Sequence, residues 1–309
     1  MVKKISNHKL SSKTVKYENV SFFAKSWTLS DRSIRDYCAK GKIKGAKLDG
    51  KTWLIPKDAQ KPERKNKSKT KNNILLNRIL EEKKHKISGG IYHKIQIDLT
   101  YNSNHIEGSK LTHDETRYIF ETRTIGNIKN KSTDDIVETV NHFRCIDTIL
   151  DNVNHKLSES LIKKLHLILK NGTSDSMLSW FKVGSYKKLP NEVGGIKTTS
   201  PGKVAHEMKK LLNTYNDKSK ITFEDLLDFH YKFEKIHPFQ DGNGRIGRLI
   251  LFKECLKNGI VPFIISDELK YYYYRGLSKW KSEKGYLMDT CLSAQDEFKK
   301  SLDYFEINY

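Results

Sequence analysis

Apolar residues recur at helical spacing along most of the chain after residue 73. The clearest runs are Ile74–Leu80, Ile91–Leu99, Ile136–Leu150, Leu161–Leu169 and Leu226–Ile236. Spacings of three and four residues place such side chains on one buried helix face. Thr112 and Glu115 have the spacing of a capping box, and Ser158 stands where it can cap the fourth run. Strand signals are sparse, so we expect a mostly α-helical body with one irregular surface hairpin within Val183–Ile196.

The first sixty residues follow a different pattern, which predicts two short helices and a hairpin. Phe22 and Trp27 belong to a short apolar face, and Ser30 is placed to cap a second helix over Asp31–Ala39. An Asp-Gly pair then separates two strand-like runs, which is a hairpin signal. A helix, a turn, a second helix and a β-wing form an arrangement that places one helix in the major groove of DNA. We therefore expect a small winged helix-turn-helix domain over residues 1–60.

Positive charge is concentrated in the N-terminal part of the chain. The 309 residues contain 57 Lys and Arg against 37 Asp and Glu, a formal net charge of +20, and residues 1–73 alone hold 20 against 6. Residues 61–73 contain alternating lysines and nothing that can be buried, so they are predicted to link the small domain to a body over 74–309. A basic head favours a nucleic-acid partner, but a basic docking arm would carry the same charge.

No part of the sequence resembles a membrane span or a secretory signal. No apolar run approaches the roughly 18 residues that a span needs, and the first twenty residues contain no apolar block. The four cysteines, Cys38, Cys145, Cys255 and Cys291, are far apart and form no Cys-x-x-Cys pair. We therefore expect a cytoplasmic protein with no membrane partner, whose cysteines are reduced and structural.

Three short stretches of the head carry a more specific signal. They are Tyr37-Cys38, Gly41-Lys42-Ile43 and Trp53–Ala59. In these stretches the head resembles the winged-helix domain of excisionase-like and MerR-like DNA-binding proteins, which implies DNA as a partner. Arg32 and Arg35 are our candidates for the nucleic-acid contacts, because guanidinium groups bind phosphate and guanine edges well.

The segment from His237 to Arg248, with the sequence HPFQDGNGRIGR, concentrates chemically useful residues. Pro238 should end the preceding helix at His237, because proline has no N–H group for the helix ladder. The glycine-rich stretch that follows opens a new helix, and free N–H groups at a helix start bind phosphate. Asp241 offers a hard oxygen ligand suited to Mg²⁺, while Arg245 and Arg248 lie about one turn apart on one helix face. A base, a metal ligand, a phosphate cradle and two cations thus fall close together.

This segment resembles the signature of the Fic (filamentation induced by cyclic AMP) family, His-Pro-Phe-x-Asp/Glu-Gly-Asn-Gly-Lys/Arg-x-x-Arg, at every fixed position. The resemblance spans most of the chain after residue 74 and implies transfer of AMP from ATP to a Ser, Thr or Tyr hydroxyl group of a target protein. It implies that His237 is the catalytic base and that Asp241 binds the magnesium ion. It also implies nucleotide contacts from the other motif residues, Phe239, Gly242, Asn243, Gly244, Arg245 and Arg248.

A second motif, Ser103-Asn104-His105-Ile106-Glu107-Gly108, precedes the catalytic segment. Ser103 and Glu107 are four residues apart and therefore share one helix face. The motif, with Gly108 at its end, resembles the family's inhibitory sequence Ser/Thr-x-x-x-Glu-Gly/Asn, on a helix near residues 91–108. The resemblance implies that Glu107 pairs with Arg248 and keeps the γ-phosphate from its productive position, so that the protein is autoinhibited. In some relatives the same glutamate supports removal of AMP, which leaves de-AMPylation open here.

Two further segments are weaker signals. The predicted hairpin resembles the family flap, which holds a target segment by strand addition, but Lys187 stands where relatives usually carry arginine. The stretch Tyr271–Arg275 either covers the adenine or packs in the core.

Two functions are consistent with these residues. The first is an autoinhibited protein adenylyltransferase that uses ATP and Mg²⁺ and modifies a target protein and itself; the family resemblance implies a homodimer. The alternative is a DNA-binding transcriptional regulator whose Fic-like body senses nucleotide. The presence of His237, which a sensor would not need, favours the enzyme. Nothing in the sequence excludes a donor other than ATP.

Overall fold

The structure is a computed structural model that describes residues 15–62, 73–126 and 131–309. The chain divides into two compact units, residues 1–65 and 66–309. Most of the predicted linker, residues 61–73, lies outside the described residues. None of the helices in the described ranges combines the length and the apolar character that crossing a membrane requires.

The first unit contains two helices and a small antiparallel sheet. Its elements are β1 (Tyr17–Asn19), α1 (Val20–Trp27), α2 (Asp31–Ala39), β2 (Lys47–Asp49) and β3 (Thr52–Pro56). The strands are ordered β1-β3-β2, with Tyr17 opposite Pro56 and Leu48 opposite Trp53. The predicted helices and hairpin are therefore present, but the sequence patterns missed β1, because three residues are too few to show a strand period.

Side-chain caps explain where the two helices of this unit begin. The Asn19 side chain accepts a hydrogen bond from the Phe22 backbone N–H, and the Ser30 side chain accepts one from that of Ser33, as predicted for Ser30. The unit has its own buried apolar residues, Val20, Phe23, Ala24, Leu29, Ile34, Tyr37, Cys38, Ile43 and Ile55. Tyr37 thus packs in the core, whereas the side chains of Arg32 and Arg35 are exposed on α2.

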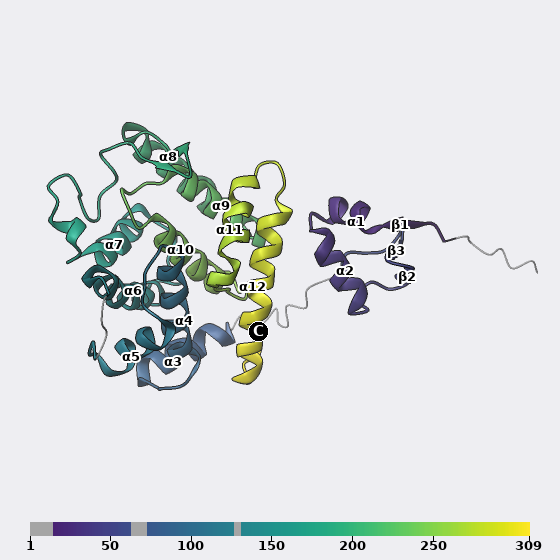
Figure 1. The fold of residues 1–309 in the computed structure, drawn as a ribbon, viewed down its shortest axis with the longest axis horizontal. Helices are drawn as coiled ribbons and strands as arrows, with labels where there is room; N and C mark the ends of the chain where they lie inside the picture. Colours follow the sequence, from purple (N-terminus) through teal and green to yellow (C-terminus); the bar gives the residue numbers. More distant parts are fainter. Residues whose placement is uncertain (1–14, 63–72, 127–130) are drawn as a thin grey trace, which may run out of the picture. The chain divides into compact units, whose positions relative to one another are not determined.

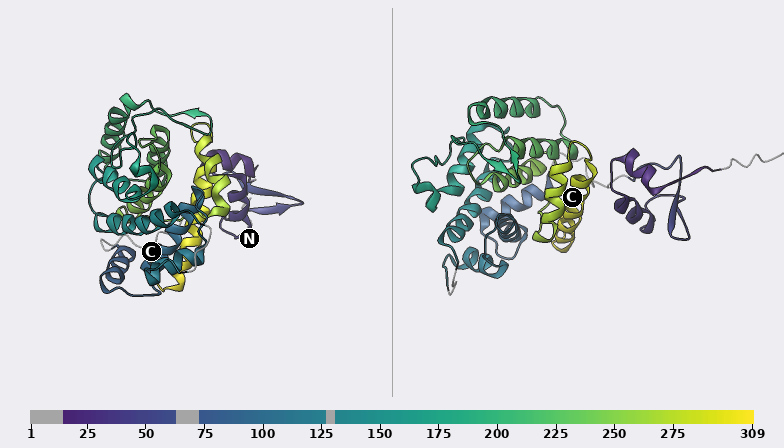
Figure 2. Two further views of the ribbon diagram at one scale, coloured as in Figure 1. Left: turned by 60° about the vertical axis from the view of Figure 1, so that its left-hand side comes forward. Right: turned by 45° about the horizontal axis from the view of Figure 1, so that its top comes forward.

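The second unit is mostly helical, as expected. Its helices are α3 (Ile74–His85), α4 (Ile91–Ile106), α5 (His113–Thr122), α6 (Thr133–Asp151), α7 (Glu159–Lys170), α8 (Pro201–Asn216), α9 (Phe223–Ile236), α10 (Asn243–Lys257), α11 (Lys270–Lys279) and α12 (Gly285–Tyr304). Short 3-10 helices lie at η1 (Ser174–Met177) and η2 (Asp267–Leu269). The rotated views in Figure 2 show helices on every visible side of this unit.

Helix α10 lies in the middle of the second unit (Figure 1). It contacts α4, α6, α7 and α9, and from Asn243 to Leu256 nearly every residue is buried. A helix buried all round needs neighbours on every side, and the core of the unit is built around it by residues such as Ile95, Ile146, Leu165 and Phe233. Because α10 starts directly after the predicted catalytic turn, the core holds that turn in place.

The predicted surface hairpin is present at the C-terminal end of the predicted range, Val183–Ile196. Its strands are β4 (Glu192–Val193) and β5 (Ile196–Lys197), joined by Gly194 and Gly195 at positive φ. Residues before β4 form turns without strand pairing. Two-residue strands carry no alternation, so glycine and proline indicated the turn but not the strand positions. The four cysteines are buried and unpaired, which confirms the expectation of free structural thiols.

Candidate active site

The turn between α9 and α10 is fixed by its own backbone and by one buried side chain. His237 ends α9 in the left-handed region at φ 52°, and its N–H donates to the Phe233 carbonyl at 2.9 Å. Gly242 follows at φ 79°, a conformation that favours glycine. The Asn243 side chain accepts a hydrogen bond from the Phe239 N–H at 2.8 Å and donates one to its carbonyl at 2.9 Å. The turn is therefore closed on itself before α10 begins.

Two residues that were predicted to contact the nucleotide, Phe239 and Asn243, also have contacts within the protein. Asn243 uses its side chain on the turn, and Phe239 is fully buried with its ring stacked on His166 at a centroid distance of 4.0 Å. The Gly184 N–H donates to Nδ1 of His166 at 2.9 Å. Burial lowers the pKa of His166 to about 4, so this ring is neutral at physiological pH. Both residues hold the turn, and the sequence spacing could not show which way their side chains point.

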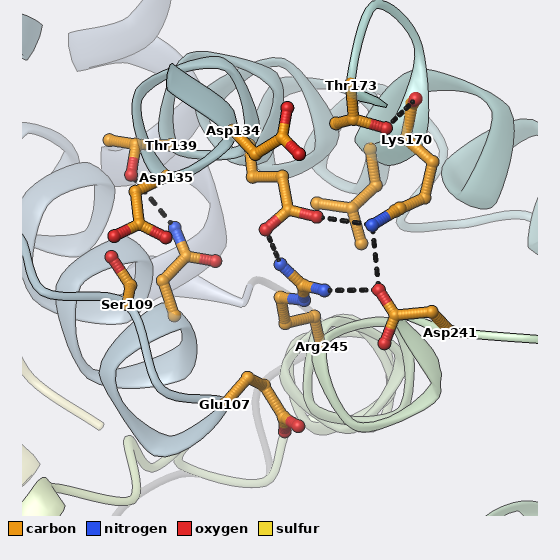
Figure 3. Close-up of polar contacts among 12 residues, drawn as sticks. Glu107, Ser109, Asp134, Asp135, Thr139, Lys170, Thr173, Asp241 and Arg245 are labelled. Atoms are coloured by element: carbon orange, nitrogen blue, oxygen red, sulfur yellow. Dashed lines mark hydrogen bonds and ion pairs between the residues drawn. The ribbon is translucent and has the colours of Figure 1, made fainter. Parts of the chain in front are cut away.

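Asp241 and Arg245 belong to a network of charged side chains, shown in Figure 3, in which the cations are buried and Asp241 is partly exposed. The Arg245 guanidinium pairs with Glu138 on α6, and its Nη2 lies 3.0 Å from Oδ2 of Asp241. The Lys170 ammonium, at the end of α7, lies 2.7 Å from the same Asp241 oxygen and 2.6 Å from Oε1 of Glu138. It also lies 2.8 Å from Oδ2 of Asp175. Two cations thus face the predicted metal ligand.

These cations determine the charge state of Asp241. Partial burial favours the neutral acid, but Arg245 and Lys170 outweigh it and hold the Asp241 pKa well below its usual range. Burial alone would lower the pKa of Lys170, yet Asp241 and Glu138 hold it above its usual value. Both groups are therefore charged at neutral pH. Sequence analysis missed Lys170 and Glu138, because neither lies near the motif in the sequence.

Arg248 contacts the second predicted motif. Its Nε donates to Oγ of Ser103 at 3.0 Å, and its Nη2 donates to the Ser103 carbonyl at 2.9 Å and to Oε1 of Glu107 at 2.6 Å. The guanidinium is 5% exposed and the Glu107 side chain 29%. Ser103 and Glu107 therefore face one partner, as their spacing predicted. Arg245 and Arg248 lie one turn apart on α10, as predicted, but contact different carboxylates.

The candidate base His237 is held in its neutral form. Burial lowers its pKa to about 4, and the positive charge of Lys187 adds to this effect. Lys187 is buried: its N–H donates to the Pro238 carbonyl at 2.9 Å, and its ammonium group donates to Oδ1 of Asn191 at 2.7 Å. Lys187 therefore connects the segment before the hairpin to the turn that contains His237.

A pocket of about 480 Å³ opens beside the turn, between the hairpin, α9 and α11. Its walls include Val193 and Ile196 of the hairpin, Tyr231 of α9, and Tyr274 and Leu277 of α11. Its volume is in the range of small-molecule sites, and most of these walls are apolar or aromatic. The sequence singled out the tyrosine stretch and the hairpin separately, but not that they border one pocket, because they are far apart in the chain.

The residues around Asp241 fit a magnesium ion bound together with a nucleotide. The Asp241 side chain is 48% exposed and carries a negative charge, so a hydrated ion can reach it. No group of three or more His, Cys, Asp or Glu side chains in the described ranges could hold a metal. Mg²⁺ is commonly held by one or two carboxylates plus substrate phosphates and water, and this donor set matches that mode.

Comparisons with known proteins agree with this geometry. Residues 156–254 match the model of the Fic/DOC family. Protein adenylyltransferase fic-1 of Caenorhabditis elegans is 30% identical over 190 residues, and Protein adenylyltransferase Fic of Drosophila grimshawi is 30% identical over 189 residues. These matches cover 57% of this chain, but the chain spans only about a third of the length of either relative, 35% and 36%.

Solved structures show the same fold over more of the chain. A Fic domain containing signaling protein from Bacteroides thetaiotaomicron is 28% identical, with a TM-score of 0.56 over 75% of this chain and 91% of the other. A fragment of Fic-1 from C. elegans superposes with a TM-score of 0.60 over 93% of this chain and 74% of the other. At 19% identity the second match shows the fold alone. Residues 156–254 are therefore similar to the Fic/DOC family, and the second unit shares its fold with solved Fic proteins.

Proposed function

We propose that this Fic-domain chain is a protein adenylyltransferase, which transfers AMP from ATP to a Ser, Thr or Tyr hydroxyl group of a target protein and of itself. One observation carries the proposal. A neutral histidine, an ionised aspartate and two arginines border a single turn at the start of α10, and a pocket of about 480 Å³ opens beside it. The curated relatives named above bear this activity in their names.

In this proposal His237 takes the proton of the acceptor hydroxyl group. A general base must be unprotonated before it acts, and a pKa of about 4 keeps His237 neutral across the physiological range. A base with so low a pKa is weak, so the proton transfer must occur as the new bond to phosphorus forms and the hydroxyl group becomes acidic. The fixed backbone of the turn sets the imidazole position before substrate arrives.

The phosphates would lie at the start of α10. Backbone N–H groups of Gly242 and Gly244 lie at the helix N-terminus, where anions are favoured. Arg245 and Arg248 supply the positive charge that a triphosphate requires. Asp241 would hold Mg²⁺, which supplies charge neutralisation between phosphate oxygens when it is bound. The adenosine would then enter the pocket between the hairpin and α11, whose aromatic and aliphatic walls suit a purine.

We also propose that Glu107 inhibits the resting protein. Its ion pair with Arg248, at 2.6 Å, uses a guanidinium nitrogen that a γ-phosphate would otherwise contact. Ser103 holds the same arginine through two more hydrogen bonds, so α4 both positions and neutralises it. The same carboxylate could orient a water molecule for the removal of AMP, which would be a second role for Glu107.

Intact-mass measurement after incubation with ATP and Mg²⁺ tests this proposal. We expect AMP on the Glu107→Gly variant and little on the wild type. The double variant Glu107→Gly/His237→Ala should carry none. Glu121→Gly, on α5 and 44% exposed beside His93, is a matched control that should behave like the wild type. Absence of AMP from all variants, tested with candidate acceptors from lysate, while ATP still binds, would instead favour the nucleotide-sensing regulator.

We propose separately that the first unit binds DNA. The observation that favours it is the exposure of Arg32 and Arg35 on α2, a helix that precedes the antiparallel pair β2 and β3; a helix-turn-helix with a wing has this order of elements. Binding of the full chain to duplex DNA should weaken steeply as salt rises. Reversing both charges, with Arg32→Glu and Arg35→Glu, should weaken binding at least about tenfold. Lys209→Glu/Lys210→Glu on α8 makes the same charge change and is the control. Equal effects of the two pairs would show only a general response to charge.

A further inference from the structure

We propose that Lys170 is a resident cation at Asp241, which competes with a divalent metal ion for this carboxylate when no nucleotide is bound. The proposal rests on the function proposed above, because that function makes Asp241 the metal ligand. Its evidence is the network in Figure 3, in which the Lys170 ammonium and Asp241 lie 2.7 Å apart.

The position of the ammonium group is set by several independent contacts. The Lys170 side chain is only 3% exposed, and its three N–H groups match three carboxylate partners, Glu138, Asp175 and Asp241, at 2.6 to 2.8 Å. Its ammonium also lies 5.6 Å from the centre of the Phe181 ring. The lysine carbonyl accepts a hydrogen bond from Oγ1 of Thr173 at 2.8 Å, which closes the end of α7. Lys170 is therefore held in place and does not sample the solvent.

The charges of the network show why a free metal ion is disfavoured. Glu138, Asp175 and Asp241 supply three negative charges, and Lys170 and Arg245 supply two positive charges. A divalent ion at Asp241 would lie within a few ångströms of both cations, where a partly buried environment screens repulsion weakly. The phosphates of a bound nucleotide would bring the missing negative charge. We therefore expect the metal ion and the nucleotide to bind together, and the metal ion to bind weakly to Asp241 when no nucleotide is present.

Removal of Lys170 should have the opposite effect from removal of an ordinary phosphate-binding lysine. In Lys170→Met the Asp241 carboxylate loses the ammonium group at 2.7 Å and keeps Arg245 as its cationic partner, and a less neutralised carboxylate favours a hard divalent ion. We expect the nucleotide-free variant to bind Mn²⁺, used as a probe for Mg²⁺, at least about tenfold more tightly than the wild type. A lysine that served only the nucleotide or the packing of α7 would give no such gain.

The experiment is a Mn²⁺ titration of the full chain without nucleotide, followed by electron paramagnetic resonance of the free ion. Lys163→Met is the matched control, because this lysine lies on the same helix, two turns earlier. Its ammonium group lies 3.3 Å from Glu159, which is not part of the network. It should leave Mn²⁺ binding unchanged. Adding Asp241→Asn to Lys170→Met should remove most of the gain, which would place the ion at Asp241.

Two results would overturn the proposal. One is equal Mn²⁺ affinity in the wild type and Lys170→Met, and the other is a gain that survives Asp241→Asn. If Lys170→Met does not fold, the double variant Lys170→Met/Asp175→Asn is used, because it keeps the net charge of the wild type. We expect it to bind Mn²⁺ more tightly than Asp175→Asn alone. Because the titration contains no nucleotide and no target, its outcome does not depend on AMP transfer. A failure of the proposed function would therefore be recognised separately, by intact mass.

Discussion

Replacing Glu107 by glutamine tests whether one ion pair couples the stability of the protein to its affinity for ATP. Glutamine has the size of glutamate and can still accept a hydrogen bond, so the substitution removes the charge and little else. In the wild type the carboxylate lies 2.6 Å from Nη2 of Arg248, whose side chain is 5% exposed. Arg248 keeps both contacts to Ser103, so the guanidinium is not left without partners in the variant.

The magnitude follows from the change in the type of hydrogen bond. A bond between charged groups contributes about 1.5–3 kcal/mol and a neutral one about 0.5–1.5 kcal/mol, so the difference is roughly 1–1.5 kcal/mol. For a unit of this size that difference lowers the melting temperature by about 2–6 °C. ATP no longer has to displace a charged partner from Arg248. The same free energy should therefore tighten ATP binding by roughly 5- to 12-fold, since about 1.4 kcal/mol is a factor of ten.

Thermal unfolding and calorimetric titration with ATP and Mg²⁺ measure the two quantities on the same samples. Asp151→Asn is the control, because this carboxylate also lies at a helix end and pairs with Lys83, but it is 63% exposed and far from α10 in the sequence. An exposed pair contributes between 0 and about 1 kcal/mol, so this variant should change the melting temperature little and ATP affinity not at all. A variant with lower stability and unchanged ATP affinity would refute the coupling and leave the ion pair purely structural.

The acid–base groups and the pocket give three further expectations. Because burial lowers the pKa of His237 to about 4, the transfer rate of Glu107→Gly should fall only below about pH 5, and a rate–pH profile with an acid limb near 6.5 would contradict this. Burial raises the pKa of Glu234 to about 8, so its contribution to stability is present below about pH 4.5 and is lost as the pH rises through 8. Glu234→Gln, which resembles the protonated acid, should therefore be more stable than the wild type at pH 9 by roughly 1–3 kcal/mol in urea unfolding, with little difference at pH 4. Ile196→Trp, at a side chain that is 52% exposed, should narrow the 480 Å³ pocket and weaken ATP binding at least about tenfold without lowering the melting temperature.

Local signals in the sequence were sufficient for the parts of the fold that depend on neighbouring residues. The capping residues Ser30, Thr112 and Ser158 start helices as predicted, because a cap involves only the next three residues. Pro238 follows the end of α9 at His237 for a similar local reason. The three-residue strand β1 was missed, and the hairpin was predicted over a longer range than its two strands occupy, because segments of two or three residues show no period.

The candidate site was predictable only where its residues are close in the sequence or belong to a motif. Lys170 is 71 residues from Asp241 in the sequence, and Glu138 is 107 residues from Arg245. Contacts between residues so far apart cannot be seen in a local sequence pattern. Phe239 and Asn243 were predicted from the motif to contact the nucleotide, and the motif did not show that the Asn243 side chain bonds to the turn or that the Phe239 ring stacks on His166. A motif records which residue types recur, but it does not distinguish those that touch a ligand from those that support its neighbours.

Arg245 and Arg248 are only three residues apart in the motif, but they have different ion-pair partners. Three positions along a helix turn a side chain by about 60° from the starting direction. That rotation is enough to direct Arg245 toward Glu138 and Asp241, while Arg248 points toward Glu107 on the α4 side. The direct ion pairs of the two arginines are therefore different, although the charge of Glu107 also raises the pKa of Arg245. We expect a substitution of Glu107 to act mainly on Arg248 and a substitution of Lys170 to act mainly on Asp241, with the two effects combined when one nucleotide contacts both arginines.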